Sequence, residues 1–307
     1  MSVVSRPYFH DEEKAFAYLE GLLWTDGPLC PHCGCNGRIT KVKANPAKRI
    51  RLGLWRCGDC KGQFTVKVGT VFEHARIPLH KMLQAVYLMT SSKKGFSAHQ
   101  LHRALEVTYK TAWFLAHRIR EAMRSGDLSP FGGNGSIVEI DETYIGRKAA
   151  MPVRRAYHHK MKVLALVCRA TGRSRAMVLD RVNQATVMPI VRANVELETR
   201  IVTDESAVYW PLKHEYQHAF VNHQIGEYGR GEVHSNTVEG YFSIFKRGMK
   251  GIYPHCGEKH LHRYLAEFDF RYSHRLGLGF DDAERSVEAL KGIAGKRLTY
   301  QRTGLAN

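Results

Sequence analysis

Long apolar runs are missing from this chain of 307 residues. Its hydrophobic stretches are short and interrupted, whereas a membrane-spanning helix needs about 20 consecutive apolar residues. The opening residues, MSVVSRPYFHDEEKAF, contain no apolar core followed by a cleavage site, so we expect no signal peptide. Internal repeats and low-complexity segments are also missing. These absences argue against a membrane or secreted protein and predict a cytoplasmic one, whose cysteines stay reduced.

Acidic side chains are scarce relative to basic ones. The sequence has 29 Asp and Glu residues against 46 Lys and Arg residues, which gives a formal net charge of +17. A positive field of this size favours a polyanion, because neutralised phosphates release condensed counterions. Nucleic acid is therefore the predicted partner, with a basic enzyme or a ribosome-associated protein as alternatives. The apolar content of 44% predicts an ordinary globular core.

Cysteine is uncommon too, but five of the seven cysteines fall between residues 30 and 60. Four of them form two Cys-x2-Cys knuckles separated by 23 residues, and each knuckle can present two thiolates to one tetrahedral zinc ion. Cys35 and His32 are weaker candidates, and ordinary buried cysteines are the alternative. Residues 38–43 and 50–56 are expected to form the hairpin of a zinc ribbon. Four protein ligands leave no open position, so this Zn2+ is expected to be structural. The predicted ligands are Cys30, Cys33, Cys57 and Cys60.

Helical periodicity follows over residues 78–124. Ser97 is typical of a helix N-cap, and a short turn at 106–108 separates this helix from the next. This layout is typical of a helix-turn-helix, whose second helix enters the major groove, although a plain helical hairpin has nearly equal support. The patterns divide this part of the chain into a zinc-ribbon DNA-binding module, 1–75, and a helical segment, 76–126. The candidate DNA contacts are Tyr109, Lys110, Thr111, His117 and Arg120.

A linker rich in Gly, Ser and Pro, at 125–136, precedes a region of strands. Apolar or alternating segments separated by turn residues, together with two helical patterns, predict an α/β domain over 136–275. Residues 276–307 are expected to form a C-terminal tail. The expected strands are 136–146, 161–170, 174–182, 199–204 and 219–223, and the expected helices are 184–194 and 235–250.

Two aspartates occupy strand positions that are hard to explain by packing alone. Alternation places Glu139 and Asp141 on one face of their strand. A carboxylate in a buried strand is costly unless it is paired or binds a metal. Asp204 ends the apolar strand Ile201–Thr203, and sites gather at the carboxyl ends of strands in layered α/β folds. The alternative is that each aspartate only forms a turn.

The helix expected at 235–250 carries a polar and an apolar stripe. Steps of three and four residues place an oxygen ligand and a lysine on one face, which could meet a metal and a phosphate together. An ordinary amphipathic surface helix is the alternative, and periodicity alone favours it. The polar stripe comprises Asn236, Glu239, Ser243, Lys246 and Lys250, and the apolar stripe Val238, Phe242, Phe245 and Met249.

Taken together, these segments resemble a known family. VEIDETYIG, IVTDES and HSNTVEGYFSIFKRGMKGIY, with HLHRYLAEFDFRY downstream, are similar to DDE transposases and retroviral-type integrases. The similarity is narrower still to the bacterial insertion-sequence transposases of the ISXO-like class, and it covers roughly residues 15–275. That class carries an N-terminal zinc ribbon and implies an RNase-H-like fold for 136–275. The implied fold class is thus α/β, with an RNase-H-like mixed sheet flanked by helices after a zinc ribbon and a helix-turn-helix-like segment.

The resemblance also implies the site and its ions. Asp141 and Asp204 match the two aspartates, and Glu239 or Asn236 matches the third position, with Glu239 preferred because a charged oxygen neutralises Mg2+ better. Two Mg2+ (or Mn2+) ions are implied, one activating a water or a 3′-hydroxyl and the other stabilising the leaving oxygen. Lys246 would contact a phosphate of the element end. Arg247 and Lys250 would extend this basic strip, and Tyr241 could stack on a splayed base.

The implied activity is transposition: binding of terminal inverted repeats, followed by metal-dependent strand cleavage and strand transfer. The implied partners are the double-stranded DNA of the element ends and of the target, and a second copy of the chain in a synaptic complex. Such a protein would be bacterial and nucleoid-associated. Two alternatives stay open, a non-catalytic zinc-ribbon DNA-binding regulator and a metal-dependent nuclease without joining activity.

Overall fold

The computed structural model describes residues 2–133, 135–149, 151–153 and 157–299. It divides into two compact units, which we call the N-terminal unit and the sheet unit. The N-terminal unit comprises Met1–Ser92, Phe96–Met123 and Asp281–Asn307, and the sheet unit comprises Lys93–Gly95 and Arg124–Phe280. Within the described residues, no helix combines the length and the apolarity that crossing a membrane requires.

A helix and a three-stranded antiparallel sheet form the cysteine-rich part of the N-terminal unit. β2 pairs with both β1 and β3, so the hairpin expected from residues 38–43 and 50–56 is confirmed. The buried carboxylate of Glu20 joins helix and sheet, because it accepts hydrogen bonds from Lys41 Nζ and Trp55 Nε1, both at 2.8 Å. The elements are α1 (Glu12–Leu23), β1 (Ile39–Lys41), β2 (Trp55–Cys57) and β3 (Gln63–Phe64).

Four further helices build the core of the N-terminal unit. Met82 and Met89, two turns apart on α2, are fully buried, and α2 packs against α1, α4 and α8. The segment 276–307, expected to be a tail, contains α8. Beyond α8 the chain pairs with an earlier loop, where Val71 N donates to Ile293 O at 3.0 Å. The helices are α2 (Leu79–Ser91), α3 (Ala98–Leu105), α4 (Tyr109–Met123) and α8 (Asp282–Lys291).

Local residues set the turn between α3 and α4. The Ser97 side chain accepts from Gln100 N, and the Gln100 side chain accepts from Ser97 N, which is a capping box. α3 ends where Glu106 takes a left-handed conformation, with φ of 54°. Thr108 Oγ1 then accepts from Thr111 N at 3.3 Å at the start of α4. The expected pair of helices around a short turn is confirmed.

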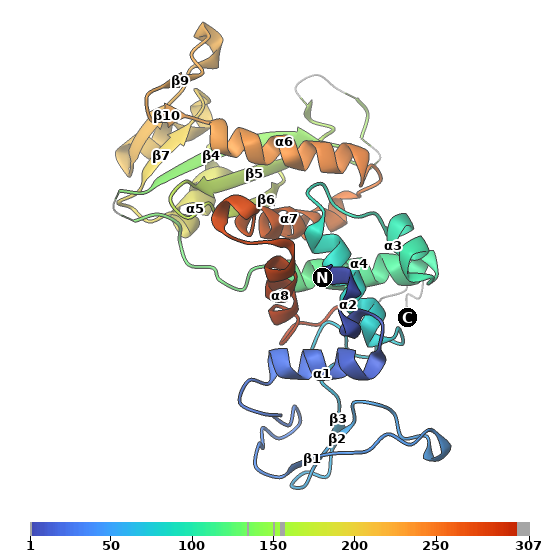
Figure 1. Ribbon diagram of the computed structural model, residues 1–307. Coiled ribbons are helices and arrows are strands. Elements are labelled where there is room, and N and C mark those ends of the chain that lie inside the picture. The colour runs from blue at the N-terminus through green and yellow to red at the C-terminus, as the bar shows by residue number, and fades with distance from the viewer. Residues whose placement is uncertain (1, 134, 150, 154–156, 300–307) are drawn as a thin grey trace, which may run out of the picture. The chain divides into compact units, whose positions relative to one another are not determined.

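Five strands of the sheet unit form one mixed sheet, in the order β6-β5-β4-β7-β8 (Figure 1). β4, β5 and β6 are antiparallel neighbours, whereas β7 runs parallel to β4 and β8 parallel to β7. Parallel neighbours need long connections, which here contain α5 and the 3-10 helix η5. The strands are β4 (Ile137–Ile145), β5 (Met161–Cys168), β6 (Ser174–Leu179), β7 (Arg200–Thr203) and β8 (Gln217–Phe220).

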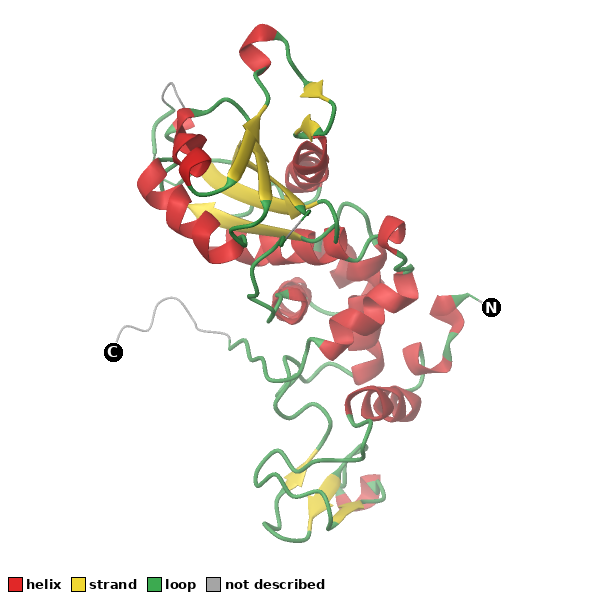
Figure 2. Cartoon of the chain, turned by 90° about the vertical axis from the view of Figure 1, so that its left-hand side faces the viewer, coloured by secondary structure: helices red, strands yellow, loops and turns green. Residues whose placement is uncertain are grey.

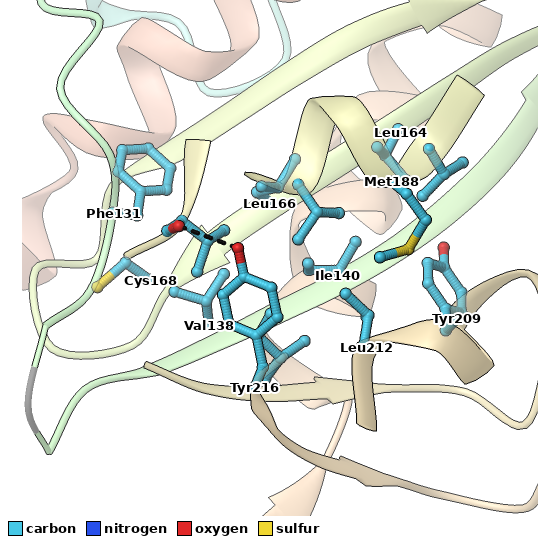
Figure 3. Packing of buried hydrophobic residues seen from close by; sticks show 14 of the residues in the cluster. Phe131, Val138, Ile140, Leu164, Leu166, Cys168, Met188, Tyr209, Leu212 and Tyr216 are labelled. Atoms are coloured by element: carbon cyan, nitrogen blue, oxygen red, sulfur yellow. Dashed lines mark hydrogen bonds between the residues drawn. The ribbon is translucent and has the colours of Figure 1, made fainter. Parts of the chain in front are cut away.

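Helices cover both faces of this sheet, so that its yellow strands lie between red helices in Figure 2. Val138 and Ile140 of β4 pack in a cluster with residues of α5 and η5 (Figure 3). The Tyr216 hydroxyl at the edge of this cluster donates to the Val195 carbonyl at 3.3 Å. Val163 of β5 points to the other face, toward α6 and α7.

The expected α/β, RNase-H-like mixed sheet flanked by helices is thereby confirmed. Two short antiparallel strands, β9 and β10, come immediately before α6 in the chain. The other α-helices and strands of the sheet unit, together with the 3-10 helix η5, are α5 (Gln184–Asn194), η5 (Ala207–His214), β9 (Gly229–Arg230), β10 (Val233–His234), α6 (Asn236–Gly251) and α7 (Glu258–Ser273).

Candidate active site and metal centres

The two cysteine knuckles of the N-terminal unit meet at one point. Cys30 Sγ lies 3.6 Å from Cys60 Sγ, and Cys33 Sγ lies 3.7 Å from Cys57 Sγ. The four sulfurs all lie within 4.8 Å of one another. A tetrahedral site with Zn–S bonds of about 2.3 Å separates its sulfurs by about 3.8 Å. The cluster therefore fits a zinc ion held by four thiolates.

Hydrogen bonds act unequally on these thiols: they lower the pKa of Cys57, whereas burial and the neighbouring sulfurs raise the pKa values of Cys33 and Cys60. Backbone N–H groups of Cys60 and Asp59, in the same knuckle, lower the pKa of Cys57 to about 6, which favours the thiolate. Cys35 has a different partner, because its Sγ donates to Asp59 Oδ2 at 2.6 Å. His32 Nε2 lies 3.5 Å from the Gln63 carbonyl. Both side chains thus have contacts outside the four-sulfur cluster.

The two strand aspartates lie at matching positions on neighbouring strands of the sheet unit. β4 pairs in parallel with β7, with Glu139 opposite Val202. Continuing this register by two residues places Asp141 beside Asp204, which directly follows the last residue of β7. Hydrogen-bonded strands lie about 4.8 Å apart. The sheet thus brings together two carboxylates that are far apart in the sequence.

The third candidate position lies in the first turn of α6. Half of the Glu239 side chain is exposed, with a relative accessibility of 50%. Glu239 Oε1 accepts a hydrogen bond from Ser235 Oγ and lies 3.8 Å from His223 Nε2. Asn236, the other candidate, is exposed in the same turn. Both remain sterically available as oxygen ligands.

Burial and mutual repulsion raise the pKa values of these carboxyls. The pKa of Asp141 is raised to about 8, first by burial and then by the negative charges of Glu142, Asp204 and Glu239. Burial also raises the pKa of Asp204, although the Ser206 N–H, which donates to Asp204 Oδ1 at 3.1 Å, opposes the shift. The cluster therefore carries unfavourable negative charge that a bound cation would relieve.

The donor set differs from that of the cysteine cluster. Asp141, Asp204 and Glu239 offer hard carboxylate oxygens, which suit Mg2+ or Mn2+. Among the residues that the structure describes, the groups of three or more metal-binding side chains with all ligand atoms within 4.8 Å belong to the cysteine-rich module. The three carboxylates are therefore more widely spaced than the four thiolates.

Three residues near the carboxylates escaped the sequence analysis. Glu142 accepts a hydrogen bond of 2.5 Å from the Tyr209 hydroxyl, and Tyr209 is fully buried in η5. Burial raises the pKa of Glu142, and this hydrogen bond opposes the shift. His223 lies close enough to lower the pKa of Asp204 through its charge. Glu142 adjoins Asp141 in the sequence, but no local pattern identifies Tyr209 or His223.

An exposed polar stripe runs along α6 from its first turn. It comprises Asn236, Glu239, Ser243, Lys246, Arg247 and Lys250. The expectation that Tyr241 stacks on a base is wrong, because this side chain is 1% exposed and its hydroxyl donates to Asp269 Oδ1 at 2.8 Å. Position 241 precedes Phe245 by four residues and so shares the buried face of the helix.

The candidate DNA contacts on α4 separate into exposed and buried residues. Tyr109 and Lys110 are exposed in the first turn. Arg120, by contrast, is only 2% exposed, and His117 is buried as well. Arg120 follows the buried Ala116 by four residues, which puts it on the inward face. We therefore withdraw Arg120 and His117 as DNA contacts and retain Lys110.

Two family models match this chain. A model described as the ISXO2-like transposase domain matches residues 133–273, which include the sheet and the candidate carboxylates. A model of a transposase zinc-ribbon domain matches residues 10–63, which include the four cysteines. Fold and matches together define a transposase with an N-terminal zinc ribbon. The chain therefore carries a zinc-ribbon domain and a catalytic-type domain that are both similar to those of transposases of the ISXO2-like kind.

Individual proteins are also similar to this chain. An uncharacterized protein of the transposable element ISH50 from Halobacterium salinarum is 29% identical over 288 residues, covering 86% of this chain and 91% of the relative. Among solved structures, a chain of the simian T-cell lymphotropic virus intasome in complex with PP2A regulatory subunit B56 gamma matches with 16% identity and a TM-score of 0.29. That match covers 56% of this chain and 67% of the other.

Proposed function

We propose that this transposase binds the terminal inverted repeats of an insertion sequence and catalyses metal-dependent DNA strand cleavage and strand transfer. One observation carries the catalytic part. The parallel register of β4 and β7 brings Asp141 beside Asp204, and Glu239 contributes to the raised pKa of Asp141 from α6. We assign the chemistry to Asp141, Asp204 and Glu239, with Asn236 as the second candidate for the third position.

The residues present fit hard divalent cations. Clustered carboxylates with raised pKa values stabilise a cation, and their oxygens match the preference of Mg2+ or Mn2+. When bound, such ions would lower the pKa of an attacking water or 3′-hydroxyl and stabilise the leaving oxygen. Asp141 and Asp204 would hold them from rigid strands, and Glu239 would complete the ligand set from α6.

DNA would be held by basic side chains on both units. On α6, Lys246, Arg247 and Lys250 continue the exposed stripe that begins at Glu239, so a phosphate chain could follow the helix away from the carboxylates. In the N-terminal unit, the zinc ribbon and the exposed Lys110 at the start of α4 would bind the terminal repeat. The net charge of +17 supports contact with DNA through both units.

Different segments of the chain would carry out DNA recognition and catalysis. The zinc-ribbon module (1–75) and the helical segment (76–126) recognise the element end, and residues 136–275 cut and join. Zinc in the ribbon would build the fold only, because four protein ligands leave no place for a substrate. A second copy of the chain in a synaptic complex would allow the two element ends to be joined to one target.

A strand-transfer assay with the element's own ends and a plasmid target tests the proposal. Wild-type protein with Mg2+ or Mn2+ should produce both cleaved ends and joined products, and Asp204→Asn should produce neither. Asp180→Asn is the matched control, because Asp180 follows β6 as Asp204 follows β7, but β6 is an edge strand that β5 and β4 separate from β7. Cleavage without joined products would favour a nuclease. Binding without cleavage by the wild type would favour a regulator and overturn the catalytic assignment.

A further inference from the structure

A buried carboxylate next to the candidate site has no role in the proposed function so far. Glu139 lies two residues before Asp141 on β4, on the same face of the strand, and is 0% exposed. Its Oε1 accepts hydrogen bonds from Arg169 Nε at 2.5 Å and from Thr237 Oγ1 at 2.7 Å. Its Oε2 accepts from the backbone N–H of Val238 at 2.8 Å. Glu139 thus joins β4 to the first turn of α6.

α6 depends on this contact for its N-terminus. The first N–H groups of a helix lack partners within the helix, and the N-cap side chain usually supplies one. Here the N-cap residue, Ser235, makes no capping hydrogen bond, and its hydroxyl donates to Glu239 instead. The carboxylate of Glu139 serves Val238 N in its place, and its negative charge also complements the positive end of the helix.

Arg169 neutralises the buried charge of Glu139 and connects Glu139 to the segment before α6. An unpaired carboxylate in the interior would be strongly destabilising, so Glu139 requires this partner. The same guanidinium donates to the carbonyls of Glu232 and His234, both at 2.7 Å. Arg169 follows β5, and its backbone N–H donates to Ile137 O. One ion pair therefore connects the central strands with the segment that leads into α6.

We propose that Glu139 and Arg169 form a positioning pair that sets the distance between Asp141 and Glu239. Asp141 lies two residues from Glu139 on a strand, and Glu239 directly follows Val238, which Glu139 binds. A short path from one candidate ligand to the other therefore runs along β4 to Glu139 and across its hydrogen bond to Val238 N. Residues that hold metal ligands in place without touching the metal orient those ligands, and their loss typically weakens metal binding about 10- to 100-fold. The inference rests on the proposed function, since it takes Asp141 and Glu239 as ligands of the same site.

Glu139→Gln tests the pair, and a second buried ion pair in the same unit provides a matched control. Glu267 and Arg271 on α7 are both buried and form an ion pair, and Glu267 accepts from the Tyr253 hydroxyl at 2.6 Å beyond the other end of α6. Binding of Mn2+ to the zinc-loaded protein, with an element-end duplex present, would be measured from the EPR signal of free Mn2+. Thermal unfolding and duplex affinity would be measured in parallel.

We expect Glu139→Gln to raise the half-saturating Mn2+ concentration at least tenfold, with duplex affinity unchanged, and Glu267→Gln to lower the melting temperature without moving Mn2+ binding. Thr237→Val, which removes one hydrogen bond to Glu139 and keeps the side-chain shape, should shift Mn2+ binding two- to fivefold, on the order of one lost hydrogen bond. This variant decides the question if Glu139→Gln does not fold.

Unchanged Mn2+ binding in folded Glu139→Gln, or in Thr237→Val if the first variant does not fold, would overturn the positioning role. Failure of the proposed function would look different, because Mn2+ binding would then be unaffected by Asp141→Ala as well.

Discussion

The zinc ribbon and the proposed carboxylate site are two arrangements of candidate metal ligands that differ in spacing and in origin. In the ribbon, two short knuckles present four sulfurs within 4.8 Å of one another, and the ligands come from a single small module. In the sheet unit, Asp141 and Asp204 come from two strands and Glu239 from a helix, and the ligand atoms are more widely spaced. Four thiolates would fill all the coordination positions of a zinc ion. The carboxylate site, by contrast, includes the half-exposed side chain of Glu239, which a substrate could approach.

Under the proposed function, this difference would separate a metal that stabilises a fold from metals that act on a substrate. Zinc binding would supply folding free energy to the ribbon, where the ligands Cys30 and Cys57 themselves form a small buried cluster with Phe64. The carboxylates require the opposite order of events, because the sheet must fold first and hold repelling charges together. The sheet unit has two extensive apolar clusters, one on each face of the sheet, that can support this cost.

The largest effect is expected from removing one cysteine ligand of the zinc ribbon. Cys57→Ser should lower the zinc content from one per chain to near zero and unfold the ribbon, because structural zinc contributes on the order of 10 kcal/mol to such modules. Zinc analysis of the purified protein and terminal-repeat binding would report the loss. Cys35→Ser is the control, since Cys35 bonds to Asp59, and it should retain full zinc. Loss of zinc in this control would show that the ligand set is wrong.

The next effect concerns the basic strip beside the carboxylates. Lys246→Ala should weaken binding of the element end about tenfold, or about 1.4 kcal/mol, and reduce the slope of log affinity against log salt by about 0.9. Fluorescence anisotropy across a salt series measures both quantities. Lys259→Ala, an exposed lysine on α7, is the matched control and should change neither. If both variants lost the same affinity for the element end, Lys246 would contribute only general electrostatic attraction and no specific phosphate contact.

A smaller effect should appear in stability, and with the opposite sign. The pKa of Asp141 is raised from 3.8 to about 8, so its deprotonation destabilises the metal-free folded state as the pH rises from about 4 toward 8. Asp141→Asn removes this cost. Its melting temperature in EDTA-free, Mg2+-free buffer should exceed that of the wild type by at least roughly 2–4 °C at pH 8, a shift that about 1 kcal/mol already produces. The two proteins should converge near pH 4, and a constant difference across the series would refute the assignment of the shift to this carboxyl.

The smallest effect on DNA affinity is expected on α4, where exposed Lys110 and buried Arg120 should affect different properties. Lys110→Ala should weaken terminal-repeat binding about threefold, through the loss of one phosphate contact, with the melting temperature unchanged. Arg120→Ala should instead lower the melting temperature, because Arg120 is buried. Circular dichroism and anisotropy on both variants provide the test. If Arg120→Ala weakened DNA binding with unaltered stability, our correction of its role would be mistaken.

Short sequence patterns were sufficient to predict elements whose contacts lie close together in the sequence. The paired cysteine spacing predicted the ribbon, and the Ser97 cap with the 106–108 turn predicted α3 and α4. Alternation along β4 correctly placed Val138 and Ile140 on the face opposite Asp141, because a strand side chain has no other choice once one face is buried.

Nonlocal features could not be read from the sequence in the same way. The register that brings Asp141 beside Asp204 depends on the pairing of strands that are not adjacent in the chain. The inward face of α4 was misjudged at Arg120, because charge suggested the surface whereas helical spacing from Ala116 placed it inside. Tyr209 contacts Glu142 from η5, a 3-10 segment without a periodic signal. The resemblance to known transposases, rather than periodicity, indicated Glu239 or Asn236 as the candidate for the third position.

Cleavage of a labelled element-end duplex by Asp141→Ala protein that retains one zinc per chain tests the central claim most directly. The ribbon and the terminal-repeat affinity should be intact, so any change reports on the carboxylate site alone. We predict a loss of cleavage of at least about 10³-fold, or about 4 kcal/mol of transition-state stabilisation, that added Mg2+ or Mn2+ does not restore. Cleavage at the wild-type rate by this zinc-loaded variant would contradict the assignment of the chemistry to the carboxylates.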